Sequence, residues 1–167
     1  MTPRPLDETL RALGTMPAFL EQMSARFTAE AARRRGPEGS LSFVENVWHL
    51  ADLEREGYGE RIARLRAEER PALPDFDGAR LARERNYQGR SVGDGLAAFA
   101  AARRANLAAF AALDAAEWDR EGVQEGVGAV TLGALPAMML EHDTGHRDEI
   151  RGLIGEGVDG GRTLASR

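Results

Sequence analysis

The sequence contains no cysteine and no apolar run as long as a membrane span. The absence of cysteine excludes disulfides, thiolate metal ligands and a cysteine nucleophile. A helix that crosses a bilayer needs about 20 consecutive, mostly apolar residues, so we expect no membrane-spanning segment. The first residues, MTPRPLDETL, do not lead from a basic region into an apolar stretch. We therefore predict no secretory signal and a cytoplasmic protein.

The chain also lacks an excess of positive charge. Its 22 basic residues are all arginine, and 27 acidic residues give it a net charge of −5. The only basic triplet in the sequence, 33–35, has Glu30 and Glu38 close by. Nucleic-acid-binding domains usually show a basic face with aromatic or glycine residues interspersed. No nucleic-acid partner is expected.

Helical periodicity dominates what is present. The 167 residues, 43% of them apolar, suffice for one domain with a buried core. Apolar residues recur every three to four positions over four segments, which predicts long helices at about 17–35, 42–69, 91–113 and 132–154. Ser42 and Glu45 have the spacing of a capping box at the start of the second helix, and Thr131 can cap the fourth.

The connections between these helices are unequal in length. A short helical stripe at 5–13 precedes the first long helix, and residues 70–90 form a long connection with two prolines. Residues 114–130 are predicted to be a glycine-rich loop, and no strand pattern is found. We predict an all-α protein, a four-helix bundle in up-down-down-up order. Residues 1–155 would form the domain and residues 156–167 a flexible tail.

Three histidines are the candidates for chemistry. His142 and His146 are four residues apart, so on a helix both imidazoles lie on one face. At about 100° per residue they fall near 280° and 320°, inside the apolar stripe of Leu135 and Met139. Buried imidazoles need polar partners, and a divalent metal ion would satisfy both rings. Core histidines that are hydrogen-bonded to carboxylates are the alternative.

His49, on the second predicted helix, is placed less favourably. A straight helix puts it about 170° from the apolar stripe of Tyr58, Ile62 and Leu65. The start of this helix is apolar nearly all round. The pattern therefore allows a buried position for His49 but does not indicate one.

Several segments resemble the DinB-like superfamily of metal-binding four-helix bundles, which includes mycothiol-dependent maleylpyruvate isomerases. They are SFVENVWHLADLERE, GAVTLGAL, LEHDTGHRDEI and the DFDG stretch before the third helix, and the resemblance spans about residues 6–155. In that family one histidine of the second helix and an HxxxH pair of the last helix bind a divalent metal. The resemblance thus implies His49, His142 and His146 as ligands. It also implies low-molecular-weight thiols as candidate cosubstrates, and a homodimer.

Three neutral imidazoles would leave coordination positions open on a divalent ion, with Zn²⁺ or Ni²⁺ expected first and Mn²⁺ or Fe²⁺ as alternatives. Asp143, at the edge of the apolar stripe, and Asp52, three residues after His49, are the predicted catalytic carboxylates. Arg103, beside an apolar stripe, could pair with an acid or bind an anionic substrate.

The function predicted from these residues is a metal-dependent enzyme that acts on a small molecule, either a thiol S-transferase or a hydrolase. Two other interpretations stay open at this point. One is a non-catalytic metal-binding stress-response protein, and the other is a bundle whose histidines are ordinary core residues.

Overall fold

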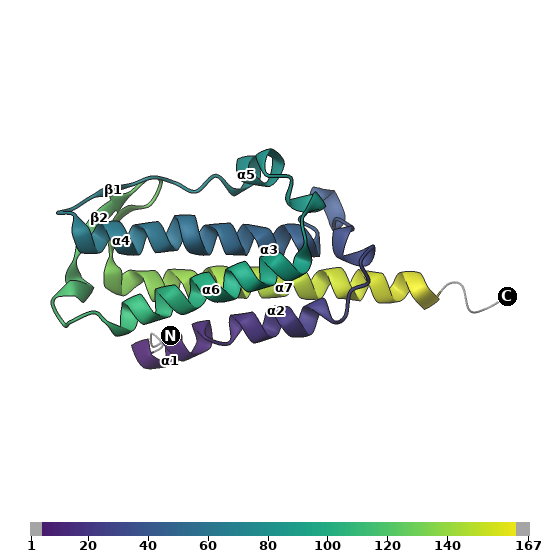
Figure 1. Ribbon diagram of the computed structural model, residues 1–167, viewed down its shortest axis with the longest axis horizontal. Coiled ribbons are helices and arrows are strands. Elements are labelled where there is room, and N and C mark those ends of the chain that lie inside the picture. Colours follow the sequence, from purple (N-terminus) through teal and green to yellow (C-terminus); the bar gives the residue numbers. More distant parts are fainter. Residues whose placement is uncertain (1–4, 163–167) are drawn as a thin grey trace.

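The computed structural model describes the backbone of residues 5–162 and the side chains of residues 5–155. This part of the chain is mostly helical, with one small sheet, and four helical rods lie side by side (Figure 1). The rods are α1 (Leu6–Leu13) with α2 (Met16–Ser24), α3 (Phe43–Asp52) with a π-helix (Leu53–Tyr58) and α4 (Gly59–Ala67), α6 (Val92–Ala111), and α7 (Leu135–Arg162). None of the described helices is both long enough and apolar enough to cross a bilayer. The predicted helical bundle is confirmed.

Apolar side chains between the rods form two clusters. The first joins α2, α3 and α6 through residues such as Phe19, Phe43, Val47, Trp48 and Phe99. The second joins the π-helix, α4, α6 and α7 through residues such as Tyr58, Ile62, Leu65, Phe110 and Leu135. On α7, Met139 belongs to the second cluster and Ile150 to the first. His142 and His146 therefore lie where one apolar cluster gives way to the other.

The capping box predicted at Ser42 is confirmed and fixes the start of α3. The Ser42 hydroxyl accepts a hydrogen bond from the Glu45 amide, and the Ser42 amide donates to Glu45 Oε1, both at 3.3 Å. Arg35 also donates to Glu45 Oε1, at 2.8 Å. Glu45 thus serves the first turn of the helix, as its position in the sequence indicates.

A π-helix between α3 and α4 sets the rotation of His49 about the helix axis. The Gly59 amide bonds the carbonyl of Glu54, five residues back, and Asn106 Nδ2 of α6 donates to the same carbonyl at 2.8 Å. A Cβ on residue 59 would stand only 3.3 Å from Asn106 Oδ1, so glycine admits this amide. A π-turn holds one more residue than an α-turn, which shifts the two halves of the rod by about 100°.

This shift corrects the straight-helix placement of His49. The angle of about 170° between His49 and the apolar stripe of Tyr58, Ile62 and Leu65 falls to about 70° once the π-turn is included. Both rings now approach His142, with centroid distances of 5.6 Å for His49 and 6.4 Å for Tyr58. The pattern of a regular α-helix could not show this.

The predicted first long helix, at about 17–35, is wrong beyond Ser24. After α2 the chain turns into two short 3₁₀ segments, Ala31–Arg33 and Pro37–Gly39. The Phe27 ring stacks on Phe43 with centroids 4.6 Å apart, and the Arg33 carbonyl accepts a 2.5 Å hydrogen bond from Gln88 Nε2. These contacts are to residues distant in sequence, and they lead the chain across the end of the bundle.

The prediction that no strand is present is also wrong. β1 (Ala72–Leu73) pairs in parallel with β2 (Glu121–Gln124), which pairs antiparallel with β3 (Gly128–Thr131). The predicted glycine-rich loop is thus largely a hairpin, whose turn has Gly126 at φ 77°. A Cβ on Gly122 would lie 2.8 Å from the Pro71 carbonyl oxygen, so only glycine lets β2 approach β1 this closely.

The last rod differs from the prediction at both ends. Thr131 caps a 3₁₀ turn (Leu132–Ala134), to which it offers its hydroxyl at 3.2 Å from the Ala134 amide, and α7 starts after that turn. At the other end, α7 continues past Gly155 to Arg162, so the predicted tail is helical in its first part. Residues 163–167 lie outside the described residues, and the division into a domain and a tail stays a prediction.

Candidate metal centre

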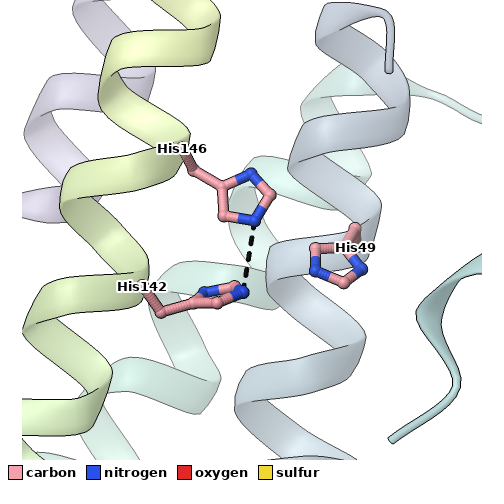
Figure 2. Close-up of side chains that lie close together, drawn as sticks. All are labelled: His49, His142 and His146. Atoms are coloured by element: carbon pink, nitrogen blue, oxygen red, sulfur yellow. Dashed lines mark hydrogen bonds between the residues drawn. The ribbon is translucent and has the colours of Figure 1, made fainter. Parts of the chain in front are cut away.

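The three histidines converge from two helices. His49 on α3 points toward His142 and His146 on α7 (Figure 2), and one nitrogen of each ring lies within 4.8 Å of the others. His142 Nε2 and His146 Nε2 are 3.2 Å apart. The centroids of the His49 and His146 rings are 5.0 Å apart. The sequence predicted these three side chains as one set, and the structure brings them together.

Asn46 fixes which nitrogen His146 turns toward the other two rings. Its Nδ2 donates to the carbonyls of Leu41 and Ser42, at 3.3 and 3.1 Å. Because a carbonyl can only accept, the Asn46 Oδ1 must be the atom that faces His146 Nδ1, at 2.6 Å. His146 therefore carries its proton on Nδ1 and presents the lone pair of Nε2 to His142. Sequence reasoning missed Asn46, although it lies one turn before His49 on the same helix.

The three imidazoles are neutral at physiological pH. Burial, together with the proximity of His142, lowers the pKa of His49 to about 4. Burial and the two neighbouring rings lower the pKa of His146 to about 3, and burial likewise lowers the pKa of His142. Neutral imidazole is the form that coordinates a metal ion, so each of the three rings has one lone pair to offer.

The donor set fits a divalent transition-metal ion. Two nitrogen ligands of a tetrahedral Zn²⁺, each about 2.0–2.1 Å from the ion, lie about 3.3 Å from each other. The separation of 3.2 Å between the Nε2 atoms of His142 and His146 agrees with this spacing. The hydrogen bond from His146 Nδ1 to Asn46 is the kind of support that metal-binding histidines usually have.

The connection between α4 and α6 packs closely on His49. The Phe76 ring meets the His49 ring edge-on, with centroids 5.9 Å apart. A Cβ on Gly78 would stand 2.5 Å from His49 Cε1. Gly78 opens α5 (Gly78–Glu84), which Asp77 caps by accepting from the Arg80 amide. Because glycine has no side chain, the connection can pack closely on the His49 imidazole at residue 78 and forms one wall beside it.

Comparisons with known proteins agree with this architecture. The DinB superfamily model matches residues 9–150. The chain belongs to the DinB superfamily. Among solved structures, YfiT from Bacillus subtilis matches with a TM-score of 0.82 at 21% identity, over 92% of this chain and 91% of that one. YfiT is described as a probable metal-dependent hydrolase with an unusual four-helix bundle topology. No curated protein matches the sequence.

In this DinB-superfamily protein Asp52 lies behind His49 and joins α3 to the connection. The Tyr87 hydroxyl and Arg85 Nη1 both donate to Asp52 Oδ2, at 2.5 and 2.7 Å. The negative charge of Asp52 partly opposes the effect of burial on the pKa of His49. The carboxylate is not a member of the histidine cluster, and its catalytic role stays a prediction.

Asp143 and Arg103 form a buried ion-pair network beside the cluster. Arg103 donates to both oxygens of Asp143, at 2.7 and 3.0 Å, and to both oxygens of Glu54, at 2.7 and 2.9 Å. It also donates to the Leu13 carbonyl at 2.9 Å. Of the roles open to Arg103 from the sequence, pairing with acids is the one observed.

This network defines what Asp143 is placed to do. Because both of its oxygens are bound to Arg103, the carboxylate ties α7 to α6 next to His142, and its catalytic role stays a prediction. Glu54 was not found from the sequence. A buried arginine does indicate that carboxylates lie nearby, but Glu54 sits in the π-helix, whose direction a regular helical wheel misplaces.

Proposed function

We propose that this protein binds one divalent metal ion through His49, His142 and His146 and uses it to hydrolyse a small-molecule substrate. The observation that carries the proposal is the convergence of three neutral imidazoles, with ligand atoms within 4.8 Å of one another. The description of YfiT, a protein of the same fold, as a probable metal-dependent hydrolase supports it. Zn²⁺ or Ni²⁺ suits an all-nitrogen donor set.

Each part of the site has a separate task in this proposal. A bound divalent ion would act as a Lewis acid, which polarises a substrate carbonyl and makes water a better nucleophile. Asn46 holds the proton of His146 on Nδ1 and so keeps Nε2 free as a ligand. Phe76 and Tyr58 place apolar ring edges against His49 and His142, which limits the access of bulk water to the imidazoles.

Metal analysis of the protein purified without a histidine tag tests the proposal. We expect about one divalent ion per chain in the wild type and most of it lost in His142→Ala, since two imidazoles bind a divalent ion far less tightly than three. Glu141→Ala, an exposed neighbour on the same helix, is the matched control and should keep the ion. Equal metal contents in wild type and His142→Ala would contradict the proposal.

The metal-loaded protein then distinguishes the reactions. A panel of esters, amides and phosphoesters is tested with and without low-molecular-weight thiols. Hydrolysis without a thiol, abolished in His142→Ala, is the expected result. Turnover that requires a thiol would favour the S-transferase reading instead. A metal-loaded protein inert to the whole panel would favour the non-catalytic metal-binding role.

Asn46 gives a second prediction for the same site. Asn46→Leu removes the nearer acceptor of His146 Nδ1 and leaves Glu149 Oε2, 3.5 Å away, so we expect metal affinity to fall about 10- to 100-fold. Asn46→Asp keeps an acceptor but loses the donors to Leu41 and Ser42, so it should retain most of the affinity. Both variants are measured by competition with a chromophoric chelator. If both lose affinity equally, Asn46 matters for the shape of α3 and does not orient His146.

We infer in addition that the rods follow the predicted up-down-down-up order. In support, α6 meets the α3–α4 rod with residue numbers rising together on both. Gly95 lies against Trp48, Arg103 binds Glu54, and Asn106 lies at Gly59. The predicted cytoplasmic location and the homodimer remain proposals.

A further inference from the structure

Arg61 on α4 is a largely buried cation that forms no ion pair with any described carboxylate. The residue is only 6% exposed. Its Nε is fully buried and donates to no acceptor. The two Nη atoms also form no hydrogen bond or ion pair with the described side chains, and they are open to solvent. The other buried arginine, Arg103, has two carboxylates and a carbonyl as acceptors. The difference marks Arg61 as the exception among the buried charges of the described chain.

Arg61 lies on the side of α4 that faces the histidines. Its guanidinium carbon is 5.4 Å from the centre of the Tyr58 ring, and the same ring meets His142 at a centroid distance of 6.4 Å and an angle of 72°. Tyr58 therefore contacts both the cation and one of the imidazoles.

The one carboxylate whose charge reaches Arg61 does not pair with it. Burial lowers the pKa of Arg61, and Tyr58 and Asp75, the latter on the connection after β1, oppose this effect only in part. The side chains of Asp75 and Arg61 form no ion pair. The Asp75 amide is held by Glu125 at 3.1 Å. No described carboxylate therefore occupies the donors of the Arg61 guanidinium.

A donor that is buried without an acceptor, as Arg61 Nε is, is unfavourable. A guanidinium is a planar fork that matches the two oxygens of a carboxylate or a phosphate. An anionic group of a bound molecule would supply the hydrogen-bond acceptors that no group of the protein provides to Arg61. If this anionic group is part of a small molecule, the rest of that molecule would lie at the three histidines.

We propose that Arg61 binds an oxyanion of the substrate, so that the substrate is a small molecule carrying a carboxylate or phosphate group. The inference rests on the proposed function for the meaning of the site. Binding of the anion by Arg61, however, does not need the metal. The test of anion binding can therefore fail while metal binding is confirmed, and metal binding can be disproved while anion binding is confirmed.

The test uses metal-free wild-type protein and follows the arginine Nε–H signals by NMR. Sodium acetate or inorganic phosphate is titrated in at constant ionic strength, with chloride as the balancing ion. The signal of Arg61 is assigned as the one missing in Arg61→Gln. We expect it to shift saturably with acetate or phosphate, and the anion that binds more tightly identifies the substrate group as a carboxylate or a phosphate.

Three variants make the test specific. Arg61→Gln should bind the same anion at least about tenfold more weakly, with its metal content unchanged. Arg64→Gln removes a partly exposed arginine of the same helix that is already bound to Glu68, and it should bind like the wild type. Asp75→Asn should bind as tightly as the wild type or more tightly, because a competing negative charge is gone.

Several results would overturn the proposal. They are no saturable shift of the Arg61 signal in the wild type, equal binding by wild type and Arg61→Gln, or an equal effect of chloride. A loss of binding in Asp75→Asn as large as that in Arg61→Gln would show that Asp75 is the partner of Arg61 in the folded protein. Metal contents are measured separately, on the metal-loaded form of each variant, so a missing metal ion is recognised independently.

Discussion

Arg103→Met is expected to lower the free energy of unfolding by about 3–5 kcal/mol, because it leaves two buried carboxylates without their counter-ion. Arg103, Glu54 and Asp143 are each no more than 2% exposed, so water cannot replace the lost hydrogen bonds. The pKa of Arg103 shows how strong the pairing is: burial alone would lower it, yet the hydrogen bonds and charges of Asp143 and Glu54 raise it above its ordinary value. Denaturant unfolding monitored by circular dichroism measures the effect.

Two further variants show whether the loss comes from unpaired charge. Arg64→Met breaks a pair on the surface of α4, where side chains remain 29% and 46% exposed, so it should cost no more than about 1 kcal/mol. Replacing all three members with Glu54→Leu, Arg103→Met and Asp143→Leu should recover much of the lost stability, because no charge is then left buried. A cost below about 1 kcal/mol for Arg103→Met alone would contradict this account of the network.

Removal of the metal ion should destabilise the wild type by an amount set by the free metal concentration. A ligand that binds only the folded state adds about 4 kcal/mol when its free concentration is 1,000 times its dissociation constant. For a chain of this size, that corresponds to a fall in Tm of about 8–16 °C on addition of a chelator. Thermal unfolding with and without the chelator measures the difference.

The matched control is His142→Asn with His146→Asn, which lacks two of the three ligands. Its Tm should not respond to the chelator. Its Tm without metal is the baseline against which the response of the wild type is judged. A wild-type Tm that stays the same after confirmed removal of the metal would mean that the ion does not bind the folded site.

The local features of the site could be predicted from the sequence. His142 and His146 are one turn apart on a single helix, and a spacing of four places two side chains on one face whatever the rest of the chain does. The Ser42–Glu45 capping box is equally local and was confirmed. The positions of the long helices followed from apolar periodicity, which depends on which face of each helix meets the core.

Features that depend on contacts between distant segments could not be predicted. The helix expected beyond Ser24 is replaced by turns because Phe27 packs on Phe43 and Gln88 binds Arg33. The hairpin β2–β3 is short and rich in glycine, and its pairing with β1 joins segments that lie some fifty residues apart. Short strands of this kind carry too little periodicity to stand out in the sequence.

The sequence by itself therefore determined a helical bundle with an HxxxH pair in its interior, because both follow from the repeat of the α-helix. The tertiary structure decided whether His49 joins that pair. It does so because Asn106, from another helix, binds the Glu54 carbonyl and supports a π-turn that rotates His49 toward α7. It also decided that Arg103 is paired while Arg61 is not, since the partners of a buried charge come from other parts of the chain.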